Sequence, residues 1–412
     1  MKKHISFIAL LLCILTLISC ASDAPSSTNS DKSTVADDTN AIAADGQTDT
    51  AESTGAESEE PPAQTEQSQQ DYKEYLLSIG FPADYAELLA PLHEAHPDWQ
   101  FNPIMITDLS NGKYTWKYII DKEVEDDENN TVYYTLSDAM DYAIDDKLVE
   151  SGIWFRAKRE SVEFFMDPRN FLYEDKIFMF ENLTGKVDYN VAAVESLLQG
   201  TFMFRKEMGD EGSDMKYAEC FLQVGKELGI SPLVIAARLR QEQGVEGKSP
   251  LISGTCGDTM WQYYTDGTNN APSYGYTESQ LKAYNGYYNF FNINATGNGY
   301  FYVFLSGMKE AKEGGWTSRY LAVKGGAAKL KSRYIDDYQQ TLYFQKYNVD
   351  PRSGRNFWGQ YMQAIHAAYD EGRSTYKAYE RVKMLDSPFV FDIPVYAGMP
   401  SSPCPDPGTR YS

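Results

Sequence analysis

The spacing of apolar and polar residues predicts that the second half of the chain is mainly helical. One predicted helix, at 215–228, is closed by Gly229, because glycine readily adopts the left-handed conformation that ends a helix. The next helix begins after Ser231, has Pro232 at its first position, and stops at Gly244. A polar, glycine-rich segment follows, from 245 to 286. Further helices are expected at 302–312, 320–334 and 357–369.

The preceding part of the folded chain, residues 71–205, mixes short helices with strands. We expect helices at 72–79, 85–93, 157–166 and 188–198, and strands at 99–106 and 131–136. The two parts predict an α+β fold class. A mainly helical domain, residues 206–385, follows a smaller mixed α/β N-terminal region, and a Pro-rich tail, residues 386–412, packs as extended chain.

Residues 1–20 have the charge and apolar pattern of an export signal. Two lysines follow Met1, an apolar run covers 5–17, and a small residue precedes Cys20. The run is too short and too early for a membrane-spanning helix. The ending, Leu17-Ile-Ser-Cys20, resembles the bacterial lipoprotein signal. That resemblance implies cleavage before Cys20, acylation of its thiol, and anchoring at the extracellular face of the cell membrane; an ordinary secretory signal with a chance cysteine is the alternative.

Residues 21–70 are expected to form a disordered acidic tether. This stretch holds 11 acidic residues and one lysine, with no aromatic residue and almost no aliphatic ones. It therefore cannot bury enough apolar surface to offset the entropy of ordering. The whole chain carries a formal net charge of −22. Such an acidic balance argues against nucleic acid as a partner, because phosphate binding needs a basic face.

The sparse histidines and cysteines argue against a metal centre and against a nucleophile–histidine triad. His93 and His96 share one helix face, but Pro97 follows at once and no acidic or cysteine ligands accompany them, so we expect surface histidines. No histidine lies between Pro97 and Ala364, which disfavours a serine or cysteine triad. Three cysteines remain after the signal, and they are Cys220, Cys256 and Cys404. Because this number is odd, any disulfide leaves one thiol unpaired.

Glu242 is the candidate with the clearest chemistry. Helical spacing places it on the same face as Ile235 and Leu239, in the last turn of its helix. Partial burial and the negative end of the helix both disfavour the carboxylate and raise its pKa. A carboxyl that stays protonated near neutral pH can protonate a glycosidic oxygen. Arg238, one turn earlier, leaves a competing interpretation open, in which Glu242 is a core-edge carboxylate satisfied by that arginine.

Three stretches carry a family pattern. Residues 240–244 read Arg-Gln-Glu-Gln-Gly, an acid on a helix closely followed by glycine. Residues 286–295 contain Asn-Phe-Phe-Asn-Ile, and the glycine pair at 325–326 precedes the segment 334–348, which begins Tyr-Ile-Asp-Asp-Tyr-Gln-Gln-Thr-Leu-Tyr. In this order they resemble the autolysin-type endo-β-N-acetylglucosaminidases, glycoside hydrolase family 73 of the lysozyme-like superfamily. Tyr338 stands where that family usually has glycine, a departure that concerns the local backbone and not the reaction.

The resemblance implies a lysozyme-like catalytic domain in residues 206–385. It implies a cell-wall hydrolase that cuts the glycan strands of peptidoglycan at N-acetylglucosamine, with Glu242 as general acid and no cofactor. A tyrosine that steadies developing charge is also implied. The residues expected at the substrate are Trp261, Tyr288, Asn289, Tyr334 and Tyr343, for each of which ordinary packing is the open alternative.

The N-terminal region carries a second resemblance. Residues 81–99 and 166–172 resemble a region that accompanies the catalytic domain of clostridial-type secreted glucosaminidases. Such a region could extend the glycan cleft, bind wall peptide, or serve only the structure.

The pattern does not identify a second carboxylate. An inverting or a retaining glycosidase needs one, whereas the acetamido group of an N-acetyl substrate could attack in its place. Two other functions remain open, a lytic transglycosylase, which also needs one glutamate, and a non-catalytic wall-binding lipoprotein. The candidates for the second carboxylate are Glu246, Asp258, Asp266 and Glu278.

Overall fold

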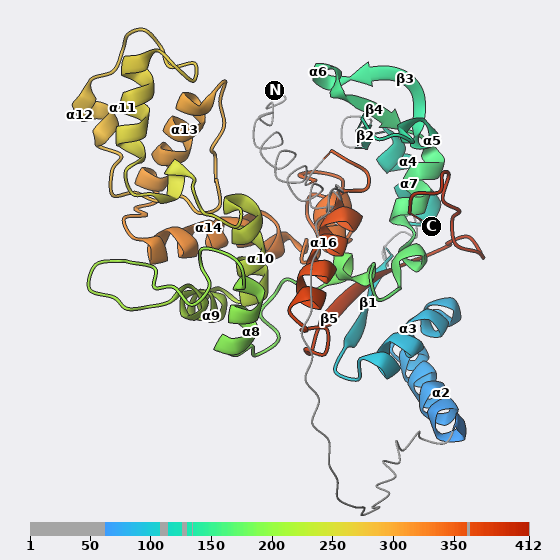
Figure 1. Cartoon of the computed structure of the whole chain (residues 1–412). Helices are drawn as coiled ribbons and strands as arrows, with labels where there is room; N and C mark the ends of the chain where they lie inside the picture. The colour runs from blue at the N-terminus through green and yellow to red at the C-terminus, as the bar shows by residue number, and fades with distance from the viewer. Residues whose placement is uncertain (1–61, 108–113, 126–129, 134, 361–362, 412) are drawn as a thin grey trace, which may run out of the picture.

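The computed structural model describes residues 62–107, 114–125, 130–133, 135–360 and 363–411 (Figure 1). The predicted signal, Cys20 and residues 21–61 of the predicted tether lie outside the described residues. Helices dominate and two small β-sheets accompany them, which confirms the predicted α+β class with its mainly helical part. Within the described ranges, no helix has both the length and the apolar character needed to cross a membrane.

The described chain begins with two packed helices. α2 (Pro62–Ser78) contacts α3 (Ala83–Ala95), and these helices confirm the predictions at 72–79 and 85–93. Residues 62–70 belong to α2, so the assignment of these residues to a disordered tether is wrong. Leu76 is fully buried and fixes the later part of α2 on the core. Once a helix is nucleated, it extends through neighbouring polar residues at little cost.

One strand from the N-terminal region and one strand from the C-terminal tail form a two-stranded sheet. β1 (Gln100–Ile106) pairs in parallel with β5 (Val390–Tyr396), in a register that joins Gln100 to Val390 and Ile106 to Tyr396. Every residue of β5 is buried. The strand predicted at 99–106 is confirmed, and the tail contributes its extended part to the same sheet. Residues from the tail therefore pack as part of the N-terminal region.

A three-stranded antiparallel sheet, in the order β2-β4-β3, lies at the upper right in Figure 1. The strand predicted at 131–136 and the helix predicted at 157–166 are confirmed in shorter form. The strands are β2 (Thr131–Tyr133), β3 (Ala143–Val149) and β4 (Trp154–Ala157). The helices beside them are α4 (Trp116–Glu125), α5 (Ala139–Tyr142), α6 (Glu150–Ile153) and α7 (Arg159–Met166).

The helical part contains a packed group and a lobe (Figure 1). The group comprises α8 (Val191–Leu198), α9 (Tyr217–Leu228), α10 (Pro232–Gln243) and α14 (Arg319–Arg333). The lobe comprises α11 (Cys256–Asp266), α12 (Glu278–Lys282) and α13 (Tyr300–Glu313), and the short 3-10 helix η3 (Pro250–Ile252) precedes α11. A second 3-10 helix, η4 (Ile335–Asp337), follows α14 and packs against it. Gly229 closes α9 with φ +67°, as its sequence position predicts. The helices predicted at 188–198, 215–228, 232–243, 302–312 and 320–334 are confirmed.

The helix predicted at 357–369 is wrong. Phe357 has φ +61° and Gly359 has φ +64°, so the backbone there lies outside the right-handed helical region. The helix that does form, α16 (Ala367–Arg381), begins later and lies in the middle of the molecule (Figure 1). It packs against α15 (Leu342–Tyr347) and against the 3-10 helix η2 (Ile177–Phe180).

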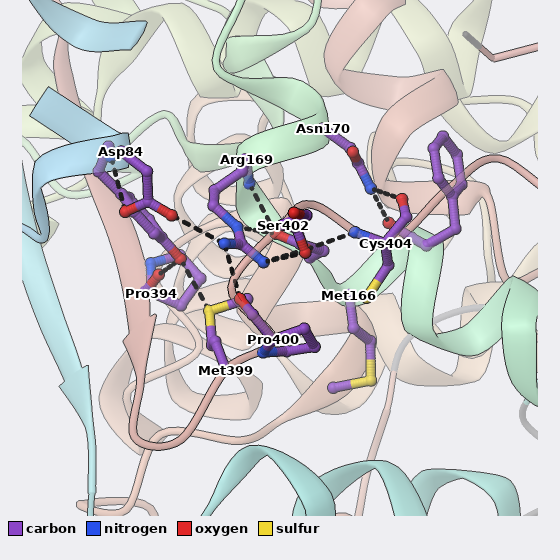
Figure 2. Close-up of polar contacts among 12 residues, drawn as sticks. Asp84, Met166, Arg169, Asn170, Pro394, Met399, Pro400, Ser402 and Cys404 are labelled. Carbon is purple, nitrogen blue, oxygen red and sulfur yellow. Dashed lines mark hydrogen bonds and ion pairs between the residues drawn. The ribbon is translucent and has the colours of Figure 1, made fainter. Parts of the chain in front are cut away.

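The motif at 166–172 holds the C-terminal tail in place (Figure 2). Arg169, in η1 (Pro168–Phe171), is only 2 % exposed. Its guanidinium donates to the Asp167 carboxylate at 2.9 and 2.8 Å and to Asp84 at 2.7 Å. It also donates to the backbone oxygens of Pro400 at 3.0 Å and Ser402 at 3.1 Å. One buried cation thus joins α3, η1 and the tail, which gives this motif a structural role.

Candidate active site

Glu242 lies in the last turn of α10, where the sequence predicts it. Ile235 and Leu239 on the same face have no exposed surface, and Glu242 itself is partly buried. The turn that leads into α10 is tight, because a Cβ atom on Gly225 would lie 2.7 Å from the carbonyl oxygen of Ile230. Glycine is therefore required at that point in α9. The close α9–α10 packing fixes the helix that presents the glutamate.

Asn292 is the direct hydrogen-bond partner of Glu242. Its Nδ2 donates to the Glu242 backbone oxygen at 3.1 Å and to Oε2 at 2.9 Å. Its Oδ1 accepts a bond from Nε2 of Gln243 at 3.2 Å, and this Nε2 also donates to the Phe290 carbonyl at 2.7 Å. The backbone of Asn292 is left-handed, with φ +50°, a conformation that asparagine tolerates better than most residues. These bonds tie the loop after α12 to the end of α10.

Asn289, expected at the substrate, braces this loop from within. Its side chain has no exposed surface. Its Nδ2 donates to the carbonyl oxygens of Ile293 at 2.9 Å and Gly307 at 3.0 Å, and its Oδ1 accepts from the Ile293 backbone nitrogen at 3.0 Å. Because these polar atoms are used inside the protein, the predicted substrate contact is not supported. Of the two asparagines in the family pattern, Asn292 is the one that reaches the acid.

The electrostatic surroundings favour a protonated Glu242. Burial raises its pKa above the ordinary value, against the opposing effects of the Arg238 charge and the Asn292 hydrogen bond. The negative charge of Glu371, on α16, raises the pKa further. Arg238 forms its ion pair with Glu371, with 3.8 Å between Nη2 and Oε2. The arginine therefore acts on Glu242 from a distance, and the raised pKa is the direction that a general acid requires.

The two tyrosines of the family pattern lie in different surroundings. Tyr334, at the end of α14, is 6 % exposed, and the charges of Arg238 and Glu371 act on its hydroxyl. Its hydroxyl therefore lies close enough to the Arg238–Glu371 ion pair to be affected by both charges. Tyr343, in α15, has no exposed surface, and its hydroxyl donates to the Met166 carbonyl at 2.6 Å. A fully buried, internally bonded side chain cannot contact a sugar, so the substrate role expected for Tyr343 is not supported.

Trp261 and Tyr288 keep part of their surface exposed. Trp261, in α11, stacks on Tyr264 with ring centroids 5.6 Å apart. The Arg319 guanidinium lies 4.7 Å from the centroid of the Tyr288 ring. A Cβ atom on Gly254 would come within 2.8 Å of the Tyr288 hydroxyl, so this ring packs closely on the loop before α11. Both aromatic residues remain candidates for contact with a sugar.

The acidic residues considered for a second carboxylate are all exposed. The partly buried acid whose charge reaches Glu242 is Glu371, and burial raises its pKa as well. Nothing in the local sequence around Glu371 marks it, because its relation to Glu242 depends on how α16 packs. The four exposed candidates are Glu246, Asp258, Asp266 and Glu278.

Histidines and cysteines serve packing in the part of the chain that the structure describes. His93 stacks on Tyr72 with ring centroids 3.6 Å apart, and His96 stacks on Trp99 at 4.0 Å. His96 is buried, so the prediction of a surface histidine is wrong at this position, because Trp99 packs against its ring. Among the described residues, no three His, Cys, Asp or Glu side chains are grouped so that they could hold a metal ion. Three buried cysteines are unpaired thiols: Cys220, Cys256 and Cys404.

No family model matches the chain. Among curated proteins it is similar to the bifunctional autolysins of Staphylococcus epidermidis. It is 24 % identical to the protein of strain ATCC 12228 over 297 residues, which is 70 % of this chain and 19 % of that protein. The protein of strain ATCC 35984 matches with the same identity and coverage. The chain thus spans about a fifth of the length of the curated relatives it matches.

Two solved structures match this chain with TM-scores below 0.5. S. aureus glucosaminidase B has a TM-score of 0.48 and 17 % identity, over 72 % of this chain and 94 % of that one. A structure named major bifunctional autolysin has a TM-score of 0.47 and 17 % identity, over 72 % of this chain and 99 % of that one. From the sequence match, the chain is a distant relative of the bifunctional autolysins.

Proposed function

We propose that the protein is a cell-wall hydrolase, an endo-β-N-acetylglucosaminidase that cleaves the glycan strands of peptidoglycan with Glu242 as general acid. The observation that carries this proposal is the setting of Glu242. The carboxyl lies at the end of a well-packed helix, burial raises its pKa, and Asn292 holds one of its oxygens. The distant relationship to proteins named bifunctional autolysins supports the cell wall as the place of action.

The hydrogen bonds around Asn292 suggest which carboxyl oxygen carries the proton. The amide of Gln243 donates to Oδ1 of Asn292, so Nδ2 is the atom turned toward Glu242. Because Nδ2 donates to Oε2, that oxygen acts as an acceptor. The proton of the neutral carboxyl therefore belongs on Oε1, and we propose that this oxygen faces the substrate.

In the proposed reaction, Glu242 transfers this proton to the glycosidic oxygen. The bond between the anomeric carbon and that oxygen breaks, and its electron pair stays with the leaving sugar. Water then supplies a hydroxyl to the anomeric carbon and returns a proton, so that the product is hydrated. The acetamido group of the N-acetyl sugar can attack first, and that route needs no enzyme nucleophile. Tyr334 is the tyrosine proposed to hydrogen-bond to the charge that develops, and Trp261 and Tyr288 are the proposed aromatic contacts to sugar rings.

Mass spectrometry of the fragments released from purified peptidoglycan tests the reaction class. We expect hydrated fragments with N-acetylglucosamine at the reducing end. Anhydro sugars on muramic acid would indicate a lytic transglycosylase. No fragments from a folded, soluble preparation would contradict catalysis and favour a wall-binding lipoprotein.

We further propose that the protein is held at the extracellular face of the cell membrane by a lipid on Cys20. The support is the sequence pattern that ends at this cysteine. Cys20→Ala is expected to release the protein from the membrane fraction, as measured by fractionation and immunoblotting. Membrane association that persists in this variant contradicts the anchor.

A further inference from the structure

Glu371 approaches α10 from α16, which lies in the middle of the molecule in Figure 1. Its neighbour Gly372 packs so closely on η2 that a Cβ atom there would lie 2.5 Å from the backbone nitrogen of Met179. Adjacent residues on a helix point about 100° apart. The close packing at Gly372 therefore fixes the rotation of α16 and, with it, the direction of Glu371.

The two oxygens of the Glu371 carboxyl differ in their contacts: Oε2 takes part in an ion pair, and Oε1 accepts no hydrogen bond from the described residues. Only 13 % of the side chain is exposed. Oε2 lies 3.8 Å from Nη2 of Arg238, the charge of which favours the ionised carboxyl. Oε1 is buried and, within the described ranges, has no hydrogen-bond partner. A buried carboxyl with an unused oxygen costs stability, so its position beside Arg238 requires an explanation other than stability.

We propose that Glu371 is a positioning residue for the acid, which holds the Arg238 guanidinium in an ion pair and so keeps this cation from pairing with the Glu242 carboxyl. The meaning of this role in catalysis rests on the proposed function of Glu242. The charged groups that act on Glu242 are Arg238, on its own helix, and Glu371, on α16; the loop between α12 and α13 presents the neutral Asn292.

The charged neighbours of Glu371 determine how its ion pair with Arg238 affects Glu242. Arg238 and Asp370 are the charged groups that act on it, and the polar side chain of Gln241 also favours its ionised form. The Tyr334 hydroxyl lies within the field of both Arg238 and Glu371. Loss of the Glu371 charge would leave the guanidinium to act on Glu242 without an offset. A cation paired with Glu242 would favour the carboxylate and remove the proton that the acid must supply.

The test measures the ionisation of Glu242 itself. Carbon-13 NMR of the side-chain carboxyls in the full chain, labelled at glutamate, follows each carboxyl with pH, and Glu242→Gln assigns the signal. In Glu371→Gln, the titration midpoint of Glu242 is expected to fall by about one pH unit, the size expected when a charge several ångströms away is removed. Glu380→Gln replaces an exposed glutamate of the same helix and is expected to keep the wild-type midpoint. An unchanged midpoint in folded Glu371→Gln overturns the proposal.

A second pair of variants tests whether Glu371 acts through Arg238. Replacing both members of a buried ion pair by neutral groups is structurally mild, so these variants also serve if the single variant fails to fold. In the Arg238→Met background, adding Glu371→Gln is expected to lower the midpoint by less than it does in the presence of Arg238, because only the direct effect of the Glu371 charge on Glu242 remains. A shift as large as the one seen with Arg238 present would show that Glu371 acts without the arginine, and it would overturn the positioning role.

The NMR measurement needs no turnover, so the two proposals can fail separately. The expected shift in a protein that releases no wall fragments supports the role of Glu371 at Glu242 and contradicts the hydrolase. Active protein without the shift contradicts only the role of Glu371. In active protein, the basic limb of the kcat/KM profile of Glu371→Gln is expected to move to lower pH by a similar amount.

Discussion

Glu181 gives a quantitative prediction about the packing that orients α16. It follows η2, is 4 % exposed, and accepts hydrogen bonds from the Tyr379 hydroxyl at 3.2 and 3.3 Å. Burial raises the pKa of Glu181 from 4.5 to about 8, against the opposing effect of the Tyr379 bond. Tyr379 lies on α16, the helix that carries Glu371. The ionisation of Glu181 therefore bears on the helix that completes the candidate site.

The sign and size of the effect follow from proton linkage. Below pH 4.5 the carboxyl is protonated in both the folded and the unfolded protein. Between pH 4.5 and 8 the unfolded protein has lost this proton while the folded protein keeps it, so the free energy of unfolding falls as pH rises. For a folded pKa of about 8, the loss between pH 4 and pH 8 reaches about 4 kcal/mol. Glu181→Gln cannot ionise, so this part of the loss should disappear.

Urea denaturation at a series of pH values from about 4 to 8 measures this difference. The wild type and Glu181→Gln are expected to have similar stability at the acid end, and the variant is expected to be more stable at pH 8. Glu246→Gln is the control, because Glu246 is exposed and pairs with Lys248 at the surface. It should follow the wild type throughout. Parallel stability curves for Glu181→Gln and the wild type would refute the reasoning.

Two further predictions concern Asn292, in the loop beside Glu242, and the Arg169 clamp, which is the set of bonds from Arg169 to Asp84, Asp167 and the C-terminal tail. Asn292→Ala is expected to move the basic limb of the pH profile of kcat/KM to higher pH, because the Asn292 N–H that favours the ionised form of Glu242 is lost. A basic limb at the wild-type pH would contradict this effect of Asn292. Asn292→Gly should show the same limb but unfold in urea with about 1 kcal/mol more free energy than the alanine variant, because φ is +50° there; equal stability counts against this reason. Arg169→Met should lower the free energy of unfolding in urea by about 3–5 kcal/mol, because Asp167 stays buried without its partner. Asp84→Asn, at a half-exposed partner, should cost less than about 1 kcal/mol, and equal costs for these two variants contradict the clamp.

Local signals in the sequence predict α10 and the place of Glu242. Ser231 and Pro232 mark the start of the helix, Gly244 marks its end, and the spacing from Leu239 places the acid on the buried face. These features depend only on neighbouring residues, which is why they can be read before the fold is known. The choice between Asn289 and Asn292 could not be made in this way. It depends on the left-handed backbone at Asn292, which turns that side chain toward α10.

Contacts between distant parts of the chain could not be predicted from local patterns in the sequence. The pairing of β1 with β5 brings together residues near the two ends of the described chain, and no local pattern specifies a parallel partner. Glu371 reaches the site because α16 packs on η2 at Gly372. The predicted helix at 357–369 missed the true start of α16 because the left-handed backbone at Phe357 is set by packing around it, and not by its own preference.

The central claim is that Glu242 is the general acid, and the most direct test compares fragment release from peptidoglycan by the wild type and by Glu242→Gln. An amide has nearly the same shape as the carboxyl but cannot give up a proton in its place. With circular dichroism and the unfolding transition unchanged, the rate should fall by about 10²–10⁴-fold. A folded Glu242→Gln protein that keeps more than about one percent of wild-type activity would contradict the assignment.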